Sequence, residues 1–333
     1  MTKRLLILGG TEFLGRATAE AALAGGWEVT VFHRGTHAPP AGARELRGDR
    51  TEPDGLAALA QTTERWDAVV DTWSAAPGAV RDSARLLADR AERYVYVSTC
   101  SVYAWPRPAG TGTEAPLVEG DPDSTASTDY PGDKRGAELA AVREFGADRT
   151  VLARAGLILG PYENIGRLPW WLTRIERGGT VAAPGPRGLP LQYIDARDLA
   201  RWLLDAADQA LSGPYDLVSP GGHTTMEELL EACVRVTGST ASLRWVSPEA
   251  VEAAGVEPWT ELPVWCPPGE LHDAMHRADV TRTLESGLRC RPVGETVADT
   301  WAWLVSIGGV PPRREGRPSP GLTPEREADL LKS

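Results

Sequence analysis

The 333-residue sequence contains only four cysteines, Cys100, Cys233, Cys266 and Cys290, and no two of them form a C-x-x-C pair. This spacing is not typical of a zinc site or a redox pair, so we expect four reduced, mostly buried thiols. No hydrophobic run reaches the roughly 18–20 residues of a membrane span. The apolar stretch 5–8 is too short for a signal peptide. We therefore expect a cytoplasmic protein with no membrane partner.

Positive charge is also scarce, because the sequence has 35 Lys and Arg residues but 46 Asp and Glu residues, which gives a formal net charge of -11. A nucleic-acid partner needs a basic surface, so we expect none. Metal ligands do not cluster either. His272 and His276 are four residues apart, as in some metal sites, but no third ligand follows, and we expect no bound metal.

Short apolar segments alternate with helical patterns through the first half of the chain, which predicts a doubly wound parallel sheet of the Rossmann type. A chain of this length fills more than one hydrophobic core. We expect the fold to be α/β, with a smaller mixed α/β C-terminal substrate domain. The expected strands are 3–8, 27–33, 68–71, 94–98, 150–159 and 191–194, and the expected helices are 16–24, 56–59, 79–90, 137–145, 196–207 and 226–236.

A glycine-containing turn connects the first expected strand to the first expected helix. Gly9 and Gly15 take the first and last positions of a G-x-x-G-x-x-G pattern, in which Glu12 stands at the middle position. Such a turn lets a pyrophosphate approach the backbone at the start of a helix. Although glycine turns also occur without ligands, the place of this one predicts a dinucleotide site built from Gly9, Thr11, Glu12, Phe13, Leu14 and Gly15.

The end of the second expected strand bears on the choice of cofactor. An acidic residue there would bind the ribose 2′-hydroxyl of NAD. The sequence has Arg34 instead, and a guanidinium suits a 2′-phosphate. Although Arg34 could also be a solvated strand-end residue, we expect NADP as the cofactor, with NAD as the less favoured alternative.

A second group of polar residues lies about 100 residues further on. Thr99 follows an expected strand, and Tyr130 and Lys134 are four residues apart at the start of a helix, where they share a face. A tyrosine is a poor acid-base group at neutral pH, but a neighbouring ammonium stabilises its phenolate form. A Y-x-x-x-K spacing alone is common by chance. In this order after the glycine turn, it predicts a redox active site in which Tyr130 and Lys134 act together with a hydroxyl of the strand-end segment 98–103.

With these motifs in place, the sequence resembles extended or atypical short-chain dehydrogenases/reductases of the NAD(P)-dependent epimerase/dehydratase group. The resembling segments are LLILGGTEFLGR (5–16), YVYVSTCSVYA (94–104), DYPGDK (129–134), RAGLILGP (154–161), LQYIDARDLA (191–200) and GLRCRPVGETVADTWAWL (287–304).

The resemblance implies Thr99 as the catalytic Ser/Thr, Tyr130 as general acid/base, and Lys134 as its partner and a ligand of the nicotinamide ribose. It also implies that Asp49 lies near the adenine. It further implies that the strand-end segment Asp71–Ser74 passes by the cofactor, with Asp71, Thr72 and Trp73 as the expected cofactor residues.

Two positions depart from the family pattern. Glu12 replaces the usual middle glycine, as in an atypical branch that includes reductases of unassigned substrate and RNA-associated proteins. Nucleotide-sugar members carry an Arg seven residues before the position of Asp198, where it contacts the diphosphate. Leu191 stands there in this sequence, which speaks against a nucleotide-sugar substrate.

The resemblance and the composition suggest a division of the chain. We expect a dinucleotide-binding domain over 1–160, to which 191–218 returns, and a substrate-binding domain over 161–190 and 219–310. A Pro/Arg-rich tail and a terminal helix are expected over 311–333. We expect a small-molecule substrate, an irregular functional loop over 104–129, and a homodimer as a possibility. The residues proposed to line the substrate pocket, with core packing as the alternative, are Trp105, Trp170, Trp171 and Trp265.

Three functions stay open on the sequence. The favoured one is an NADP(H)-dependent oxidoreductase that transfers hydride between nicotinamide C4 and a carbonyl or alcohol carbon. The first alternative is a nucleotide-sugar epimerase or dehydratase that keeps its cofactor tightly bound. The second is a non-enzymatic dinucleotide sensor or RNA-associated protein, which the intact Thr99, Tyr130 and Lys134 oppose.

Overall fold

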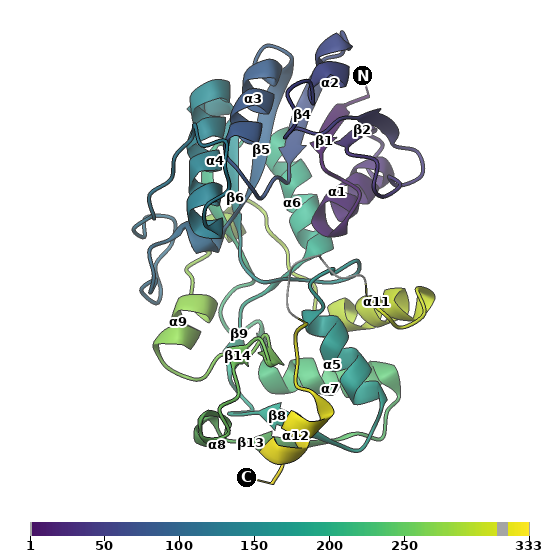
Figure 1. Cartoon of the computed structure of the whole chain (residues 1–333), viewed down its shortest axis with the longest axis vertical. Coiled ribbons are helices and arrows are strands. Elements are labelled where there is room, and N and C mark those ends of the chain that lie inside the picture. The colour runs from purple at the N-terminus through teal and green to yellow at the C-terminus, as the bar shows by residue number, and fades with distance from the viewer. Residues whose placement is uncertain (1, 312–318, 333) are drawn as a thin grey trace.

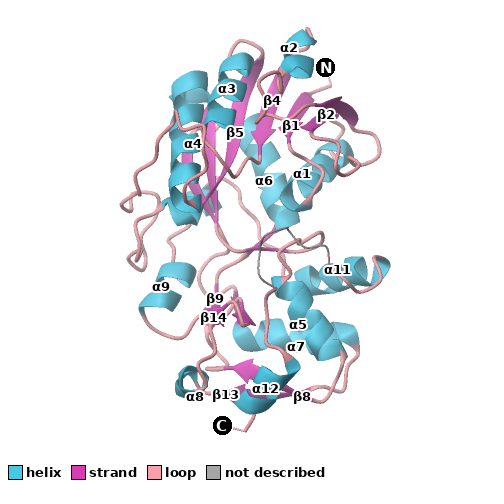
Figure 2. Ribbon diagram, in the orientation of Figure 1, coloured by secondary structure: helices cyan, strands magenta, loops and turns pink. Residues whose placement is uncertain are grey.

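A parallel sheet of seven strands forms the centre of the upper part of the molecule in Figures 1 and 2, in the order β11-β6-β5-β4-β1-β2-β3. The computed structural model describes residues 2–311 and 319–332. The strands are β1 (Arg4–Leu8), β2 (Glu28–His33), β3 (Arg44–Arg47), β4 (Trp66–Asp71), β5 (Ala91–Thr99), β6 (Thr150–Ala155) and β11 (Gly213–Leu217). This arrangement confirms the predicted doubly wound α/β fold.

Helices cover both faces of this sheet. Leu5 and Ile7 of β1 belong to a core with α1 and α6, whereas Leu6 and Leu8 belong to a core on the other face with α2, α3 and α4. Because both faces are buried, β1 is apolar at every position after Arg4. The covering helices are α1 (Phe13–Ala24), α2 (Ala57–Gln61), α3 (Gly78–Leu87), α4 (Tyr130–Phe145) and α6 (Ala196–Asp208).

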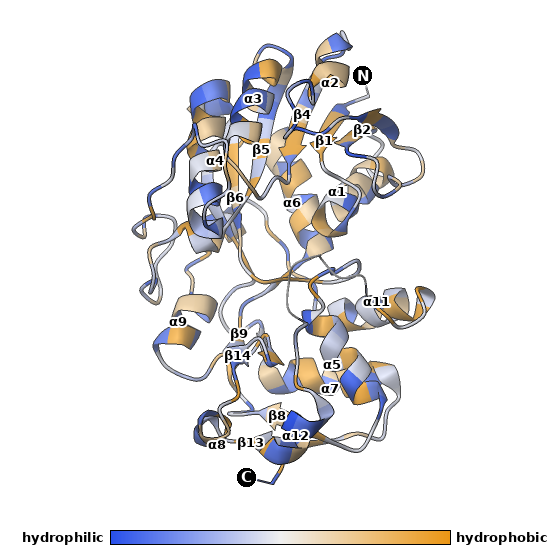
Figure 3. Ribbon diagram, in the orientation of Figure 1, coloured by the Kyte–Doolittle hydropathy of each residue, from blue (hydrophilic) through white to orange (hydrophobic). Residues whose placement is uncertain are grey.

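A third hydrophobic core lies below the sheet in Figure 1, and is built from later segments around α5, α7 and α11. In Figure 3 the hydrophobic colours gather on the sheet strands and on the inner sides of the helices. The helices of this part are α5 (Arg167–Glu176), α7 (Met226–Thr237), α8 (Pro248–Ala253), α9 (Glu270–His276), α10 (Thr281–Glu285), α11 (Val293–Ser306) and α12 (Pro324–Leu330). The remaining strands are β7 (Ile158–Leu159), β8 (Thr180–Pro184), β9 (Pro190–Leu191), β10 (Ile194–Asp195), β12 (Thr224–Thr225), β13 (Ser242–Val246), β14 (Pro258–Trp259) and β15 (Leu262–Pro263).

Several elements differ from the sequence prediction in extent. The strand expected over 150–159 is two strands, β6 and β7, and that expected over 191–194 is split between β9 and β10. The Tyr130–Lys134 segment, expected at a helix start, and the helix expected over 137–145 form one helix, α4, which the Asp129 side chain caps by accepting a hydrogen bond from the Gly132 backbone N–H. The predicted terminal helix is confirmed as α12, which Thr323 caps. Most of the Pro/Arg-rich tail, 312–318, lies outside the described residues.

None of the helices in the described part of the chain is both long enough and apolar enough to cross a membrane. The first strand enters the sheet at one end of the molecule, and α12 packs against β8 at the other (Figure 1). The carboxyl ends of the sheet strands point towards the third core in Figure 1.

Candidate active site

The glycine turn between β1 and α1 is fixed by positions that only glycine fills without strain. Gly9 and Gly10 have φ angles of 115° and 90°. A Cβ on Gly15 would lie 2.6 Å from the Gly10 nitrogen. Helix α1 begins after Glu12, whose side chain makes no capping hydrogen bond. The first backbone N–H groups of α1 are thus uncapped at the turn, which fits the pyrophosphate of a dinucleotide.

A pocket of about 730 Å³ opens at this turn and reaches into the third core. It brings together most of the residues that the sequence analysis assigned to the cofactor and to catalysis. The predicted residues that line it are Gly9, Thr11, Glu12, Phe13, Leu14, Gly15, Thr72, Thr99, Trp105, Tyr130 and Lys134. Its volume is within the range of small-molecule sites, on the order of 300–1,000 Å³.

Four predicted cofactor residues do not line this pocket. Arg34 is exposed at the end of β2, and Asp49 folds back to accept hydrogen bonds from Thr51. Those hydrogen bonds and the nearby Arg34 charge lower the pKa of Asp49. Arg34 and Asp49 are therefore neighbours beyond the pocket, on the side where the adenosine of a dinucleotide would lie.

The side chains of the other two, Asp71 and Trp73, form hydrogen bonds or ion pairs with other residues of the chain. Burial opposes ionisation of Asp71, but its ion pair with Arg50, at 2.7 Å, and a 2.6 Å hydrogen bond from the Tyr94 hydroxyl keep its pKa below the usual value. Trp73 donates its indole N–H to the Ala76 carbonyl. These side chains shape the strand end, and Thr72 between them faces the pocket.

The three predicted catalytic residues meet at the carboxyl end of β5. Thr99 ends that strand, Tyr130 begins α4, and Lys134 lies one turn further along the same helix. The Tyr130 side chain is accessible, since the residue is 41% exposed, whereas Lys134 is buried at 3%. A reacting group in the pocket can therefore meet the phenol directly while the ammonium stays behind it.

The Lys134 ammonium is anchored by backbone and side-chain oxygens. Its Nζ donates to the carbonyls of Trp73 and Val97, at 2.5 and 2.6 Å, and to the Tyr96 hydroxyl at 3.1 Å. An ammonium has three donors. A ribose hydroxyl that bound Lys134 would thus share or replace one of these partners.

The four predicted pocket tryptophans separate into two groups. Trp105 lines the pocket and is 58% exposed. Trp171 and Trp265 are fully buried in the third core, where each indole N–H donates to a backbone carbonyl, and Trp170 packs against that core. Core packing therefore accounts for these three. A tryptophan that the sequence analysis did not select, Trp259 of β14, lines the pocket instead.

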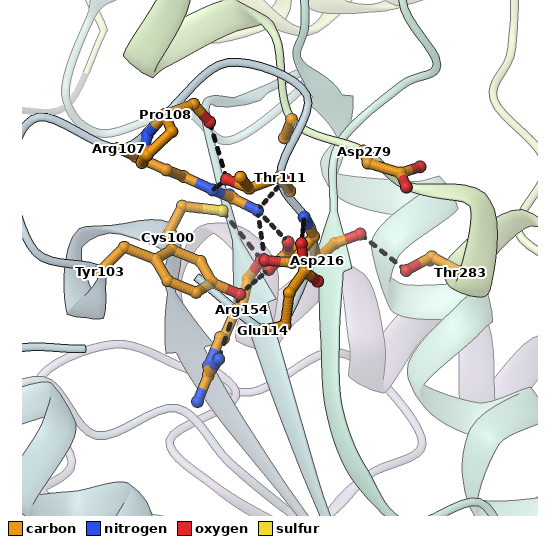
Figure 4. Close-up of polar contacts among 12 residues, drawn as sticks. Cys100, Tyr103, Arg107, Pro108, Thr111, Glu114, Arg154, Asp216, Asp279 and Thr283 are labelled. Atoms are coloured by element: carbon orange, nitrogen blue, oxygen red, sulfur yellow. Dashed lines mark hydrogen bonds and ion pairs between the residues drawn. The ribbon is translucent and has the colours of Figure 1, made fainter. Parts of the chain in front are cut away.

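A buried polar network lies beside the predicted catalytic residues, and no sequence motif predicted it. Ser98, next to Thr99, donates to the Glu138 carboxylate, which also accepts two hydrogen bonds of 2.9 Å from Arg154. Arg154 in turn contacts the Tyr103 hydroxyl at 3.1 Å. Beyond it, the network continues through the residues drawn in Figure 4, to Asp216 and Arg107.

His272 and His276 are buried with their rings 5.2 Å apart. His276 Nδ1 accepts a hydrogen bond from the Gln192 backbone N–H, and His272 Nε2 contacts the Pro190 carbonyl. Burial lowers the pKa of His276 to about 4. In the part of the chain that the structure describes, no group of three potential ligands could hold a metal.

Comparison with known proteins agrees with this geometry. The model of the NAD dependent epimerase/dehydratase family matches residues 5–217. The chain belongs to this family, as the sequence resemblance predicted; it is thus an enzyme that uses a nicotinamide dinucleotide cofactor. No curated protein sequence matches the chain.

Solved structures share the fold at low sequence identity. WbmG of Bordetella bronchiseptica, in complex with NAD and UDP, is 18% identical with a TM-score of 0.64, over 95% of this chain and 99% of that one. The UDP-glucose 4-epimerase of Thermus thermophilus, in complex with NAD, is 20% identical with a TM-score of 0.61, over 92% and 100%. A putative epimerase of Burkholderia cenocepacia is 20% identical with a TM-score of 0.65, over 92% and 97%.

Replacing Gly15 with Ala is expected to weaken dinucleotide binding by roughly 10- to 100-fold, because the new Cβ must displace the Gly10 backbone at a cost of about 1–3 kcal/mol. A fluorescence titration with the dinucleotide measures this. Gly294→Ala in α11 is the matched control, since its Cβ would meet no atom within 4 Å. Equal affinities for wild type and Gly15→Ala would contradict the assignment of the turn.

Proposed function

We propose that the protein is an NADP-dependent epimerase or dehydratase that acts on a nucleotide-activated sugar. The observation that carries the proposal is the continuity of the pocket. It runs from the uncapped start of α1, past Thr99 and Tyr130, to Arg167 and Trp259 in the third core. A dinucleotide and a substrate with an anionic portion would both have partners along it.

The residues of the chain have separate roles in this reaction. A nicotinamide dinucleotide bound in the pocket would supply the hydride acceptor and donor. Tyr130 takes the proton from the substrate hydroxyl and returns it when the carbonyl is reduced. The Thr99 hydroxyl holds the same oxygen in place. Lys134 lies one helical turn after Tyr130 on α4, and its ammonium would hold the nicotinamide ribose.

The substrate diphosphate needs a cation, and the Leu191 position does not supply one. Leu191 is fully buried in the third core and does not line the pocket. Arg167, the first residue of α5, does line it, with its guanidinium 5.3 Å from the ring centroid of Trp259. A charged guanidinium suits phosphate oxygens, so Arg167 supports a diphosphate-containing substrate despite Leu191.

A second candidate is an NADPH-dependent carbonyl reductase, which the sequence analysis favoured. The specific observation for it is the same Leu191, because the chain lacks the arginine that nucleotide-sugar members carry at that position. Such a reductase would use Tyr130 as a proton donor and would exchange its cofactor in each cycle. The two functions therefore differ in whether the nicotinamide is consumed.

Incubation of the purified chain with a panel of UDP- and dTDP-sugars, with product analysis by chromatography, tests the proposal. We expect an isomerised or dehydrated sugar and no net change in nicotinamide absorbance. Stoichiometric consumption of added NADPH with simple carbonyl compounds, without any sugar-nucleotide product, would overturn the proposal and favour the reductase.

We infer NADP rather than NAD from the end of β2. Arg34 is exposed there, and the Arg47 side chain passes close to the following Gly35, within 3.5 Å of where its Cβ would be. Arg34 thus offers an exposed guanidinium at the strand end where the adenosine ribose of a dinucleotide would lie, and Arg47 beside it is paired with Glu45 at 2.6 Å. An additional phosphate on that ribose would find charge-assisted hydrogen bonds.

Replacing Arg34 with Ala is expected to raise the dissociation constant for NADP by roughly 10- to 100-fold, because a hydrogen bond to a charged group contributes about 1.5–3 kcal/mol. NAD affinity should stay unchanged. Arg44→Ala, at the other end of β3 from Arg47, is the control. Equal loss of NADP and NAD affinity in Arg34→Ala would contradict 2′-phosphate recognition.

A further inference from the structure

Arg107 reaches the substrate side of the pocket from the loop that follows β5. The residue is buried, at 6% exposed, and it lines the pocket together with Cys100 and Tyr103. Its guanidinium carbon lies 4.0 Å from the Tyr103 ring centroid. Figure 4 shows the Cys100 thiol and the Tyr103 ring beneath this guanidinium. Since Cys100 follows Thr99, Arg107 stands beside the catalytic strand end.

One edge of the Arg107 guanidinium is fixed by the protein. Nη2 donates to the carbonyls of Thr111 and Gly112, at 2.6 and 2.9 Å, and to the Asp216 carboxylate at 2.6 Å. Nε donates to the Thr111 hydroxyl at 3.3 Å. The guanidinium therefore cannot turn, and its orientation is set before any substrate binds.

The other edge of the guanidinium has only a weak protein partner. Nη1 donates to no oxygen atom of the described residues, and the remaining polar neighbour of the guanidinium is the Cys100 thiol, a weak acceptor. Arg107 lines the pocket, so a ligand bound there can reach this edge of the guanidinium.

The charge of Arg107 is balanced by Asp216 of β11. This carboxylate is buried at 1% and also accepts a 2.5 Å hydrogen bond from the Tyr103 hydroxyl. The corner of the pocket is thus polar but close to neutral. A phosphate would meet little net charge there, and an apolar group would leave the Nη1 donors without a partner. A hydroxyl or carbonyl oxygen is uncharged and accepts a hydrogen bond, so it suits this corner of the pocket.

We propose that Arg107 is a specificity-determining residue whose Nη1 donates a hydrogen bond to a hydroxyl or carbonyl oxygen of the substrate near the reacting carbon. The substrate class is therefore polyhydroxylated, and analogues that lack that oxygen are rejected. The sugar portion of this class rests on the proposed function. A site built to hydrogen-bond a substrate hydroxyl discriminates strongly against its deoxy analogue, by up to about 10⁴-fold.

Matched substrate pairs test this role. One pair is the UDP-sugar that the panel shows to be turned over and its analogue deoxygenated next to the reacting carbon. The other is hydroxyacetone and acetone, reduced with NADPH. For each pair, the ratio of kcat/KM between hydroxylated and deoxygenated substrate is measured. We expect a ratio of at least roughly 100 in the wild type.

The decisive variant removes both charges, Arg107→Met with Asp216→Leu, because Arg107→Met alone would leave a buried carboxylate unpaired and could prevent folding. Arg107→Lys keeps the charge but loses the planar fork. Arg149→Met is the control: Arg149 also lies over an aromatic ring, 4.4 Å from the Phe145 centroid, and binds backbone carbonyls, but does not line the pocket.

In the double variant, we expect the kcat/KM ratio to fall below roughly 10. The ratio should also fall in Arg107→Lys, and it should be unchanged in Arg149→Met. An unchanged ratio in the double variant overturns it. Turnover of the ketone pair alone overturns the proposed function, while the same ratio still decides the role of Arg107. Turnover of neither pair contradicts both.

Discussion

Replacing Tyr130 with Phe is expected to lower kcat by about 10²- to 10⁴-fold, which is the usual contribution of a positioned acid-base group. Only the hydroxyl is removed, and the ring that lines the pocket stays. Its hydroxyl makes no hydrogen bond with other residues in the described part of the chain, and the residue is 41% exposed. Stability and dinucleotide affinity should therefore be unchanged, as thermal unfolding and a fluorescence titration would measure.

Tyr162→Phe provides the control for this variant. Tyr162 donates its hydroxyl to Glu20 at 3.2 Å and does not line the pocket. Its removal should leave kcat as in the wild type. If Tyr130→Phe retains wild-type turnover, the acid-base assignment is wrong, whatever cofactor and substrate the enzyme uses.

Replacing Glu138 with Leu is expected to lower the free energy of unfolding by about 3–5 kcal/mol, because it leaves buried charge without its partner. Glu138 is fully buried, and Arg154, which it binds in a bidentate pair, is only 2% exposed. Glu138 also lies one turn after Lys134 on α4 and accepts a hydrogen bond from Ser98. Urea unfolding monitored by circular dichroism measures the change.

Two further variants separate charge burial from the loss of packing. Glu138→Leu combined with Arg154→Met removes both charges and should recover part of the loss. Glu144→Leu on the same helix is the control, since Glu144 pairs with the exposed Arg85 and should cost less than about 1 kcal/mol. A loss for Glu138→Leu as small as that of Glu144→Leu would show that the network contributes little to stability.

The sheet could be predicted from the sequence because its central strands are buried on both faces and are continuously apolar. The edge strand β3 escaped prediction because its sequence, RELR, carries no apolar run and is partly exposed. The breaks between β6 and β7 and between β9 and β10 depend on pairing with distant segments. Such pairing leaves no local pattern.

The site was predictable where spacing along the chain carries its chemistry. Gly9 and Gly15, and Tyr130 and Lys134, are close in sequence, and all four line the pocket. The pairing of Arg107 with Asp216 joins residues 109 positions apart and could not be inferred from either segment. Tryptophans that line the pocket could not be distinguished from tryptophans of the core for the same reason, because the burial of an indole depends on distant neighbours.

A crystal structure of the chain with bound NADP tests the central claim most directly. We expect the pyrophosphate at the start of α1, the 2′-phosphate beside Arg34, and the nicotinamide between Thr99 and Tyr130, with Lys134 near its ribose. A dinucleotide bound away from the Gly9–Gly15 turn, or in the turn with its nicotinamide away from Tyr130, would contradict the account.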